Sequence, residues 1–504
     1  MEKNKSGSGS YFVNVPDLEN NTSGNPGNGA FFHRSLTLLD GALLVIGSMI
    51  GSGIFIVSAD ISRQVGSAGW LIVVWLLSGF ITLAAALSYG ELSGMYPKAG
   101  GQYVYLREAF GKLYGFLYGW SFFAVIQTGT IAAVGVGFAK FTGYLIPSLG
   151  DSNILFGDPH GFNISAAQIL GIGMIFLLTF LNTLGIKSGK WIQFFFTFAK
   201  IAAMAMLIFC GFLFFKDQST WQMNWSDAWM AKTIATAKDG TISHNSLIGL
   251  ALVGPMCAAM VGALFSSDAW NNVTFIAGEI KRPERNIGLS LFIGTLVVTV
   301  IYISMNLMYL NVMSIHEIAN APSDRVALAA ALKIFGAAGT TIIALMIMVS
   351  TFGCNNGLIL SGSRVYYTMA NDGLFFPAAG KLNNKGVPGA ALWMQFVWAS
   401  LLCLSGKYGD LLDFIIFTVL LFYIMTIIGI FKLRKTQPDM PRPYKAFGYP
   451  IIPLIYILLA ATICLVLLKY KPTYTWPGLI IVLIGIPIYY ILERRGKKIS
   501  GNKN

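Results

Sequence analysis

The stretch Gly47-Ser48-Met49-Ile50-Gly51-Ser52-Gly53-Ile54-Phe55 interrupts an apolar run that extends from about residue 36 to 58. The run is long enough to cross a membrane, since about 20 apolar residues span the hydrocarbon layer as a helix. Three glycines within seven residues weaken that helix, by about 1 kcal/mol each relative to alanine. A break inside a bilayer is tolerated only where the chain is buried in protein or lines a cavity. The stretch therefore predicts either a binding site in mid-membrane or a close packing contact, because Gly47 and Gly51 have the small-xxx-small spacing.

Unwinding at Gly51-Ser52-Gly53 would present backbone groups that suit one class of ligand. A helix N-terminus in mid-membrane attracts a carboxylate, while exposed carbonyl groups attract an ammonium group. These are the two charged ends of an α-amino acid. The stretch by itself leaves the binding site and the packing contact as equal alternatives.

A second apolar run, near residues 249–277, contains a matching interruption, Leu264-Phe265-Ser266-Ser267-Asp268-Ala269-Trp270-Asn271-Asn272. A charged residue at the centre of a spanning helix costs about 2.5–3.5 kcal/mol on insertion scales and typically faces a cavity or a partner. Paired interruptions in corresponding positions of two halves indicate an inverted-repeat transporter with its site at the midplane. Phe265 and Trp270, which singly would indicate only packing, then become candidates for an aromatic lid over the substrate.

Lys200 is another charge that the sequence places in mid-membrane. It lies 11 residues into the apolar run near 189–215, about 17 Å from the cytoplasmic end at 1.5 Å per residue. That depth is too great for the side chain to reach the interface easily. We expect either a structural role, in which the ammonium group bonds to carbonyls of the unwound first helix, or a proton-carrying role. The structural role is preferred.

The composition requires a bilayer as the solvent. The chain has 504 residues, of which 55% are hydrophobic and 11% are charged, and its mean hydropathy is +0.64. A soluble chain carries about a quarter charged residues. No part of the sequence has the composition of a separate soluble domain, and twelve apolar runs have the length of a spanning helix. The runs lie near residues 36–58, 69–94, 113–146, 166–185, 189–215, 249–277, 288–311, 338–363, 387–406, 411–432, 450–468 and 475–492.

The positions of lysine and arginine indicate the orientation. If both termini face the cytoplasm, the inner segments carry 24 of these residues and the outer loops carry 8. Cytoplasmic loops are enriched in basic residues, so this bias predicts cytoplasmic termini and an even number of helices. Topology thereby explains the net charge of +13, and no nucleic-acid partner is expected. The first 30 residues are polar, so we expect a disordered tail and no signal peptide.

Several function classes lack the residues that they require. The five cysteines lie within apolar runs without CxxC spacing and the four histidines lie in tails or loops, so neither disulfides nor a metal site is expected. The sequence contains no GxxxxGK[ST] motif for an ATP-driven pump and no HExxH-type motif for a membrane enzyme. A membrane sensor or channel is the alternative of a different class, but neither a signalling domain nor a continuous polar stripe is evident. No cofactor is expected.

Five motifs follow one another at successive apolar runs. They are Gly47-x-x-x-Gly51-Ser52-Gly53-Ile54-Phe55; Tyr89-Gly90-Glu91-Leu92 with Pro97-Lys98-Ala99-Gly100-Gly101 and residues 103–111; Thr197-Phe198-Ala199-Lys200; Trp270-Asn271 followed by Glu279 and Pro283; and Ser350-Thr351-Phe352-Gly353 followed by Ser363-Arg364-Val365-Tyr366-Tyr367. In this order they resemble the signatures of the amino acid–polyamine–organocation (APC) superfamily of permeases, most closely its L-type amino-acid transporter branch. The resemblance covers roughly residues 34–495.

The resemblance implies an all-α integral membrane protein with twelve transmembrane helices and a 5+5 inverted-repeat, leucine-transporter-type fold. Helices 1 and 6 are expected to be discontinuous. The implied boundaries are 1–34 for a disordered cytoplasmic N-tail, 35–495 for the transporter domain, about 36–215 and 249–432 for the inverted repeats, 450–492 for the peripheral helices and 496–504 for a basic cytoplasmic C-tail.

The resemblance also implies a secondary transporter that carries amino acids across the cytoplasmic membrane by alternating access, through exchange of neutral amino acids or through proton-linked uptake. Lys200 occupies the place where sodium-coupled relatives bind a cation, so sodium independence is expected. The implied substrate-binding residues are Ser48, Met49, Ile50, Gly51, Ser52 and Gly53 of the first helix and Phe265, Ser266, Ser267, Asp268, Trp270 and Asn271 of the sixth.

Asp268 departs from the L-type pattern, which often has small uncharged residues at this place. An ionised Asp268 that faces the cavity favours a cationic amino acid or a polyamine, whereas a protonated or paired Asp268 allows neutral substrates. The outer loops contain no cysteine for a disulfide-linked partner subunit, so no obligatory protein partner is expected.

Overall fold

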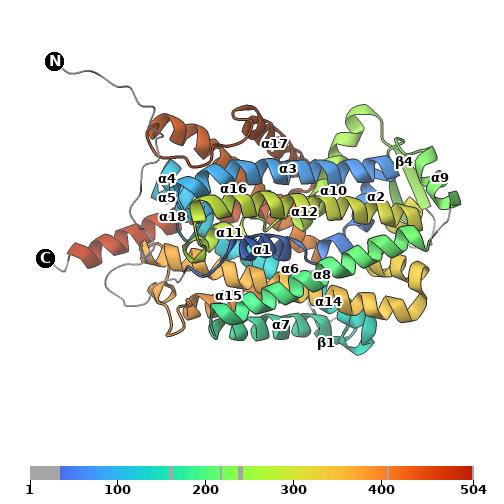
Figure 1. The fold of residues 1–504 in the computed structure, drawn as a ribbon, viewed down its shortest axis with the longest axis horizontal. Coiled ribbons are helices and arrows are strands. Elements are labelled where there is room, and N and C mark those ends of the chain that lie inside the picture. The colour runs from blue at the N-terminus through green and yellow to red at the C-terminus, as the bar shows by residue number, and fades with distance from the viewer. Residues whose placement is uncertain (1–33, 158–162, 216–217, 237–241, 406–407, 502–504) are drawn as a thin grey trace, which may run out of the picture.

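The computed structural model describes residues 34–157, 163–215, 218–236, 242–405 and 408–501. Long helices run side by side along the longest axis of the molecule (Figure 1). The predicted N-tail lies outside the described residues except for Arg34, and the backbone of the last helix continues into the predicted C-tail as far as Gly501.

The helices and strands have the following bounds. The α-helices are α1 (Leu38–Met49), α2 (Ser58–Val65), α3 (Ala68–Met95), α4 (Gln102–Phe110), α5 (Lys112–Ser121), α6 (Gln127–Leu145), α7 (Ala166–Thr183), α8 (Ile186–Leu213), α9 (Gln218–Ser226), α10 (Val253–Ser266), α11 (Asn272–Phe275), α12 (Pro283–Val312), α13 (Ile315–Ala319), α14 (Val326–Asn371), α15 (Gly389–Ser405), α16 (Tyr408–Thr436), α17 (Ile451–Tyr470) and α18 (Pro472–Gly501). The short 3-10 or π helices are η1 (Gly53–Phe55), η2 (Phe122–Ile126), η3 (Pro147–Leu149), η4 (Gly249–Leu252), η5 (Ala277–Glu279), η6 (Pro322–Asp324) and η7 (Pro377–Gly380). The strands are β1 (Ile154–Gly157), β2 (Asn163–Ser165), β3 (Lys232–Thr236) and β4 (Ile242–Ser246).

The helices confirm the prediction of a mainly helical, multi-pass membrane protein. Within the described residues, ten helical segments are long and apolar enough to cross a membrane, and shorter apolar helices lie at Leu38–Met49 and Gly389–Leu404. Each of the twelve predicted runs coincides with helical structure. Length and composition alone recognise ten of them as spans, so the number twelve stays a prediction.

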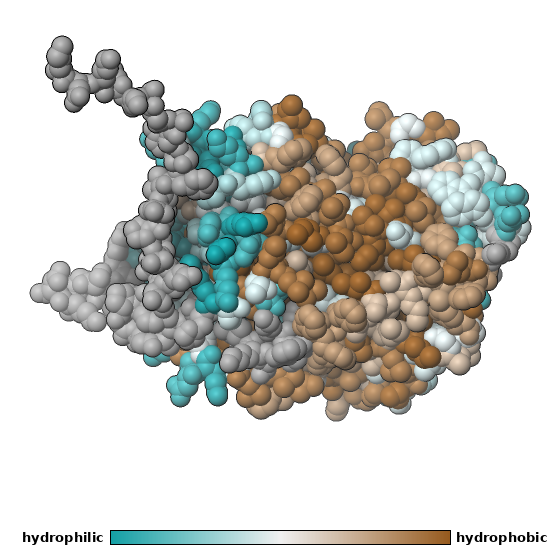
Figure 2. All heavy atoms as spheres, viewed as in Figure 1, coloured by the Kyte–Doolittle hydropathy of each residue, from teal (hydrophilic) through white to brown (hydrophobic). Residues whose placement is uncertain are grey.

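Apolar side chains form the surface that meets lipid. Figure 2 shows a band of hydrophobic residues across the middle of the visible face, with hydrophilic residues gathered toward both ends. On α8, Phe198 and Phe209 are 69% and 67% exposed. Soluble proteins rarely expose an apolar surface of this extent, so the band agrees with the composition in requiring a bilayer.

The start of α1 is tied to the segment that follows α11. Thr37 caps α1, because its hydroxyl accepts from Asp40 N at 3.4 Å while Asp40 Oδ2 accepts from Thr37 N at 2.8 Å. Directly before this cap, Leu36 forms a parallel β-bridge with Ile280, and Leu36 N donates to Glu279 O at 3.0 Å. The entry to the first interrupted helix and the exit from the second therefore share backbone hydrogen bonds.

Two antiparallel hairpins, β1–β2 and β3–β4, were not predicted, so the all-α prediction omits them. Their strands are three to five residues long, too short for an alternating pattern to be recognised in the sequence. The segment between α9 and β3 lies beside the start of α3: Gly69 N donates to Ala228 O at 3.0 Å, and Trp70 Nε1 donates to Trp229 O at 3.1 Å. The hairpin and α9 lie at the opposite end of the bundle from α4 and α5 (Figure 1).

Ion pairs join the helices at both ends of the bundle. At the end that carries α4, Arg364 Nε of α14 lies 3.0 Å from Glu279 Oε1 of η5, and the two side chains are 0% and 1% exposed. At the other end, Arg63 of α2 lies 2.8 Å from Asp324 of η6, and these side chains are 32% and 37% exposed. The first pair is buried and the second is open to solvent.

Removing one partner of the buried pair will destabilise the fold. We expect Arg364→Met to lower the free energy of unfolding by about 3–5 kcal/mol, because Glu279 is left as an uncompensated buried charge. The control is Lys333→Met, which removes the ion pair between Lys333 and Glu317. These two side chains are 35% and 44% exposed, so we expect this substitution to lower the free energy of unfolding by about 0–1 kcal/mol. The unfolding midpoints of purified protein in detergent measure both changes. Equal shifts in the two variants would contradict the expectation.

Candidate functional site

The first helix ends inside the protein. α1 stops at Met49, and the chain turns through residues 50–52 before it continues as η1 and α2. Lys200 of α8 is fully buried, and its Nζ donates to Gly47 O and to Ile50 O, each at 2.8 Å. The ammonium group thereby caps the carbonyl end of α1. This is the contact that the structural interpretation of Lys200 requires.

Side chains from α12 and α14 donate to the carbonyl oxygens of Ser48, Met49 and Ile50. The donor–acceptor pairs are Cys354 Sγ to Ser48 O at 3.0 Å, Tyr302 Oη to Met49 O at 3.1 Å and Ser350 Oγ to Ile50 O at 3.4 Å. Each of the four carbonyls from Gly47 to Ile50 therefore has a donor within the protein. Beyond the turn, the described contacts give no acceptor to the backbone N–H groups of Gly53 and Ile54 at the start of η1.

The second interruption separates α10 from α11. α10 ends at Ser266, and Asn272 begins the four-residue α11. Ala269, between them, has φ of +63°, the left-handed region that residues other than glycine seldom adopt. This reversal places the Asp268 side chain, which is 7% exposed, against α16, where Tyr423 Oη donates to Asp268 Oδ1 at 2.6 Å.

The two interruptions are in direct contact. Tyr302 Oη lies 2.9 Å from Ser266 O and 3.1 Å from Met49 O, so its single proton is shared between the carbonyl ends of α1 and α10. A Cβ atom on Gly53 would lie 2.1 Å from Ser266 Oγ and 3.1 Å from Ser266 Cα. Only a glycine fits this approach, so the stretch combines a close packing contact with a helix end.

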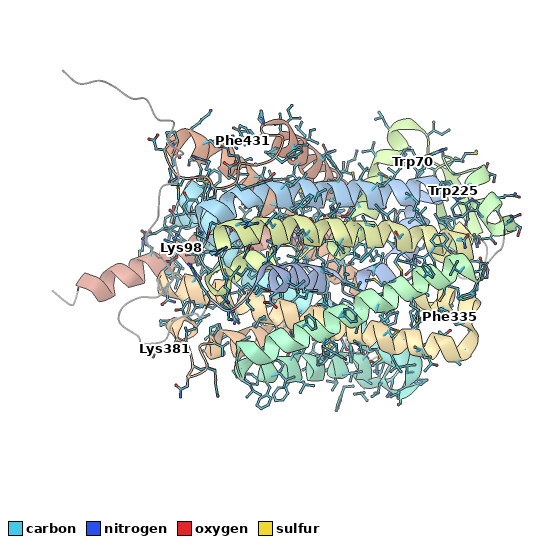
Figure 3. All side chains as sticks on the ribbon, viewed as in Figure 1. Trp70, Lys98, Trp225, Phe335, Lys381 and Phe431 are labelled. Carbon is cyan, nitrogen blue, oxygen red and sulfur yellow. The ribbon has the colours of Figure 1, made fainter. Side chains whose placement is uncertain are left out.

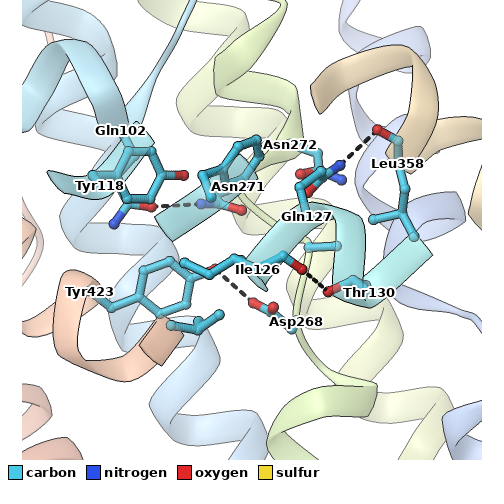
Figure 4. Close-up of a pocket in the computed structure, with 13 residues that line it drawn as sticks. Gln102, Tyr118, Ile126, Gln127, Thr130, Asp268, Asn271, Asn272, Leu358 and Tyr423 are labelled. Atoms are coloured by element: carbon cyan, nitrogen blue, oxygen red, sulfur yellow. Dashed lines mark hydrogen bonds between the residues drawn. The ribbon is translucent and has the colours of Figure 1, made fainter. Parts of the chain in front are cut away.

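A small cavity lies beside the second interruption (Figure 4). Its lining contains one carboxylate and four amide side chains, and no Lys, Arg or His. One of the amides, Asn272, is 1% exposed, and its Nδ2 has no hydrogen-bond partner among the described residues. The lining residues are Gln102, Tyr118, Phe122, Ile126, Gln127, Thr130, Asp268, Ala269, Asn271, Asn272, Leu358, Val419 and Tyr423.

A second small cavity adjoins the first. The two share Asp268, Val419 and Tyr423, and the second is otherwise lined mainly by apolar and aromatic side chains from α3, α10, α16 and α17. Its lining residues are Ile81, Thr82, Ala85, Leu264, Ser267, Asp268, Trp270, Ile416, Val419, Leu420, Tyr423 and Tyr456.

The structure places the predicted site residues in three groups. Asp268 and Asn271 line the first cavity, and Ser267, Asp268 and Trp270 line the second. The remaining predicted residues are buried at the contact between the two interruptions and line neither cavity. They are Ser48, Met49, Ile50, Gly51, Ser52, Gly53, Phe265 and Ser266.

The sequence prediction missed the residues that complete the site from other helices. Four residues carry no signal in the sequence that they belong to the site, and only their contacts in the structure show it. They are Tyr302, Tyr423, Asn272 and Gln102. Gln102 Oε1, for example, accepts from Asn271 Nδ2 at 3.0 Å across 169 residues of sequence. Within the described residues, no three His, Cys, Asp or Glu side chains are grouped in a way that would hold a metal ion.

Comparison with known proteins identifies the class to which this fold and site belong. The family model described as amino acid permease matches residues 36–489, and the chain belongs to that family. The resemblance to APC permeases of the L-type branch is thereby confirmed, as is the prediction of a transporter and not an enzyme.

Individual relatives match along almost the whole chain. The serine/threonine exchanger SteT of Bacillus subtilis is 30% identical over 466 residues, which cover 92% of this chain and 97% of that protein. The b(0,+)-type amino acid transporter 1 of Mus musculus is 27% identical, with coverage of 91% and 88%. The large neutral amino acids transporter small subunit 2 of Homo sapiens is 28% identical, with coverage of 93% and 82%.

A methyl group at Gly53 will force the two interruptions apart. We expect Gly53→Ala to lower the rate of amino-acid transport by about tenfold or more, since small displacements at a binding site have effects of that order. The control is Gly173→Ala on α7, where an added Cβ meets nothing within 4 Å. Uptake into proteoliposomes measures both variants, and Ser266→Gly should restore part of the activity of Gly53→Ala. Full activity of Gly53→Ala alone would show that the contact does not matter for transport.

Proposed function

We propose that this protein is a secondary active transporter that exchanges amino acids across the cytoplasmic membrane by alternating access. The observation that carries the proposal is the junction of two interrupted helices, α1 and α10, beside a cavity with polar side chains inside the helical bundle. Interrupted helices at the midplane are where transporters of this kind bind substrate. The names of the relatives all describe amino-acid transport, and one describes exchange.

The helix ends suggest how an amino acid would bind. The N–H groups of Gly53 and Ile54 open η1 and suit the substrate carboxylate, as helix N-termini suit anions. The carbonyl ends of α1 and α10 meet at Tyr302 and suit the substrate ammonium group. The contacting residues would come from Ser48 to Gly53 and from Phe265 to Asn271, with the side chain of the substrate in the first cavity. Phe265 or Trp270 would act as the gate.

Lys200 is assigned the role of a fixed structural cation, and transport is proposed to be independent of sodium. Its ammonium group occupies Gly47 O and Ile50 O, the carbonyls that a bound metal cation would need. Because this charge is already bonded to the carbonyl end of α1, the break needs no exchangeable ion to stabilise it. Proton-linked uptake, with Lys200 as the proton carrier, is the alternative mode of coupling.

The proposed architecture is twelve transmembrane helices, with helices 1–5 and 6–10 as inverted repeats (about 36–215 and 249–432), peripheral helices at 450–492 and both termini in the cytoplasm. Figure 3 shows Lys98 and Lys381 toward one end of the bundle and Trp70 and Trp225 toward the other. Basic residues are enriched on the cytoplasmic side, which supports assigning the end with α4 and α5 to the cytoplasm of the cell.

The second candidate is a transporter of cationic amino acids or polyamines. Asp268 lines both cavities, and neither lining contains a basic residue that would neutralise it. An ionised carboxylate in a low-dielectric site attracts a cationic side chain. Neutral amino acids stay the first proposal because Tyr423 already donates to this carboxylate.

The proposed partners are the amino-acid substrate and the lipid bilayer, with protons only in the alternative coupling mode. Neither nucleic acid nor an obligatory protein subunit is proposed. Cys257, Cys354, Cys403 and Cys464 are buried and Cys210 is half-buried, so none of these five thiols is positioned in an outer loop for a bond to a second chain.

Uptake of labelled amino acids into proteoliposomes tests the proposal. Each amino acid is measured with and without internal amino acid, with and without an inward proton gradient, and with sodium replaced by choline. Stimulation only by internal substrate supports exchange. Uptake into empty vesicles that follows the proton gradient supports the symport alternative, and a requirement for sodium contradicts the assignment of Lys200.

Replacement of Lys200 removes two of the donors at the end of α1. We expect Lys200→Met to reduce exchange by about tenfold or more, because unpaired backbone groups in the membrane cost several kcal/mol each. Lys381→Met, at an exposed position, is the control and is expected to leave exchange unchanged. Exchange rate and its pH dependence are both measured. If neither changes in Lys200→Met, both roles considered for this lysine are wrong.

A further inference from the structure

The hydrogen bond between Tyr423 and Asp268 lies at the boundary between the two cavities. Both residues line the amide-rich first cavity and the apolar second cavity. Figure 4 shows the Tyr423 ring directed at the Asp268 carboxylate from α16, with the bond between them. The pair therefore separates two spaces that would otherwise join.

Tyr423 is held in place by the rings around it. Its ring centroid lies 5.2 Å from that of Trp270 and 5.9 Å from that of Tyr89, and its side chain is buried. The hydroxyl therefore cannot turn away without disturbing two neighbouring rings. At 2.6 Å, the bond has the length expected for a hydroxyl that donates to an ionised carboxylate.

This bond changes what a substrate would meet in the first cavity. Of the described side chains, Tyr423 is the one that donates to Asp268, so one carboxylate oxygen is already engaged. Among the described residues of this lining, a buried donor, Asn272 Nδ2, has no hydrogen-bond partner. A buried donor without a partner costs free energy until a ligand supplies an acceptor. The cavity in this state thus favours a neutral side chain with an oxygen over a cationic side chain.

We propose that Tyr423 determines the charge specificity of the transporter by masking Asp268. With the mask in place, the site takes neutral amino acids whose side-chain oxygen accepts from Asn272. Without the mask, the carboxylate is open to an ammonium group, and the second cavity offers room beside Trp270 and Tyr456. The inference rests on the proposed function, because it assigns the substrate side chain to the same site.

The test compares glutamine and ornithine, which have side chains of similar length and differ in charge. Uptake of each labelled compound is measured in proteoliposomes of the wild-type chain, Tyr423→Phe and Tyr89→Phe. We expect Tyr423→Phe to raise the ratio of ornithine to glutamine uptake by about tenfold or more, as loss of a hydrogen bond to a charged group warrants. Tyr89→Phe is the matched control: its ring also packs against Tyr423, but its hydroxyl makes no hydrogen bond to Asp268 in the described structure.

Each outcome has one meaning. An unchanged ratio of ornithine to glutamine uptake in an active Tyr423→Phe protein overturns the proposal. Uptake of ornithine as readily as glutamine by the wild-type chain also overturns it, and this measurement requires no variant. An equal change in Tyr89→Phe assigns the effect to ring packing and also overturns it. A wild-type chain that transports no amino acid, including those outside this pair, contradicts the proposed function itself.

Discussion

The contact between the Lys200 ammonium group and the carbonyl end of α1 is the constraint on which the site depends. A helix that stops inside a bilayer leaves its last carbonyls without partners, and each costs several kcal/mol if it stays unpaired. Lys200 supplies two donors from α8, while Tyr302 of α12 and Ser350 and Cys354 of α14 supply the others. The break in one helix thereby determines where three other helices must place polar side chains.

The same constraint explains where the free polar groups lie. Since the carbonyls from Gly47 to Ile50 already have donors, the end of α1 is fixed in place. Among the described residues, Asn272 Nδ2 at the second interruption is buried without a partner and belongs to the lining of the first cavity, whereas the unpartnered Ser48 Oγ at the first interruption lines neither cavity. The cavity consequently lies beside α11 and α16, with residues 48–53 set behind it.

The sequence was sufficient for features that depend on local composition. Apolar length predicted twelve runs that coincide with helical structure, but not the short helices α2, α9 and α13. The glycines at 51 and 53 and the polar residues at 266–268 indicated the places where α1 and α10 end. The bond from Lys200 to α1 could be anticipated because a single buried cation needs acceptors and a broken helix offers them. The bond from Tyr423 to Asp268 could not, since it joins residues 155 positions apart and a tyrosine in an apolar helix carries no signal of its partner. The hairpins were missed because their strands are too short.

The two ends of the bundle differ in the charges that would have to separate if the site opened. Opening the end with α4 would expose the pair between Arg364 and Glu279, whose side chains are 0% and 1% exposed, and each charge would exchange its partner for water. Opening the other end parts Arg63 from Asp324, whose side chains are 32% and 37% exposed, and such pairs contribute little. Opening at the α4 end would therefore change the hydration of the paired charges more than opening at the other end.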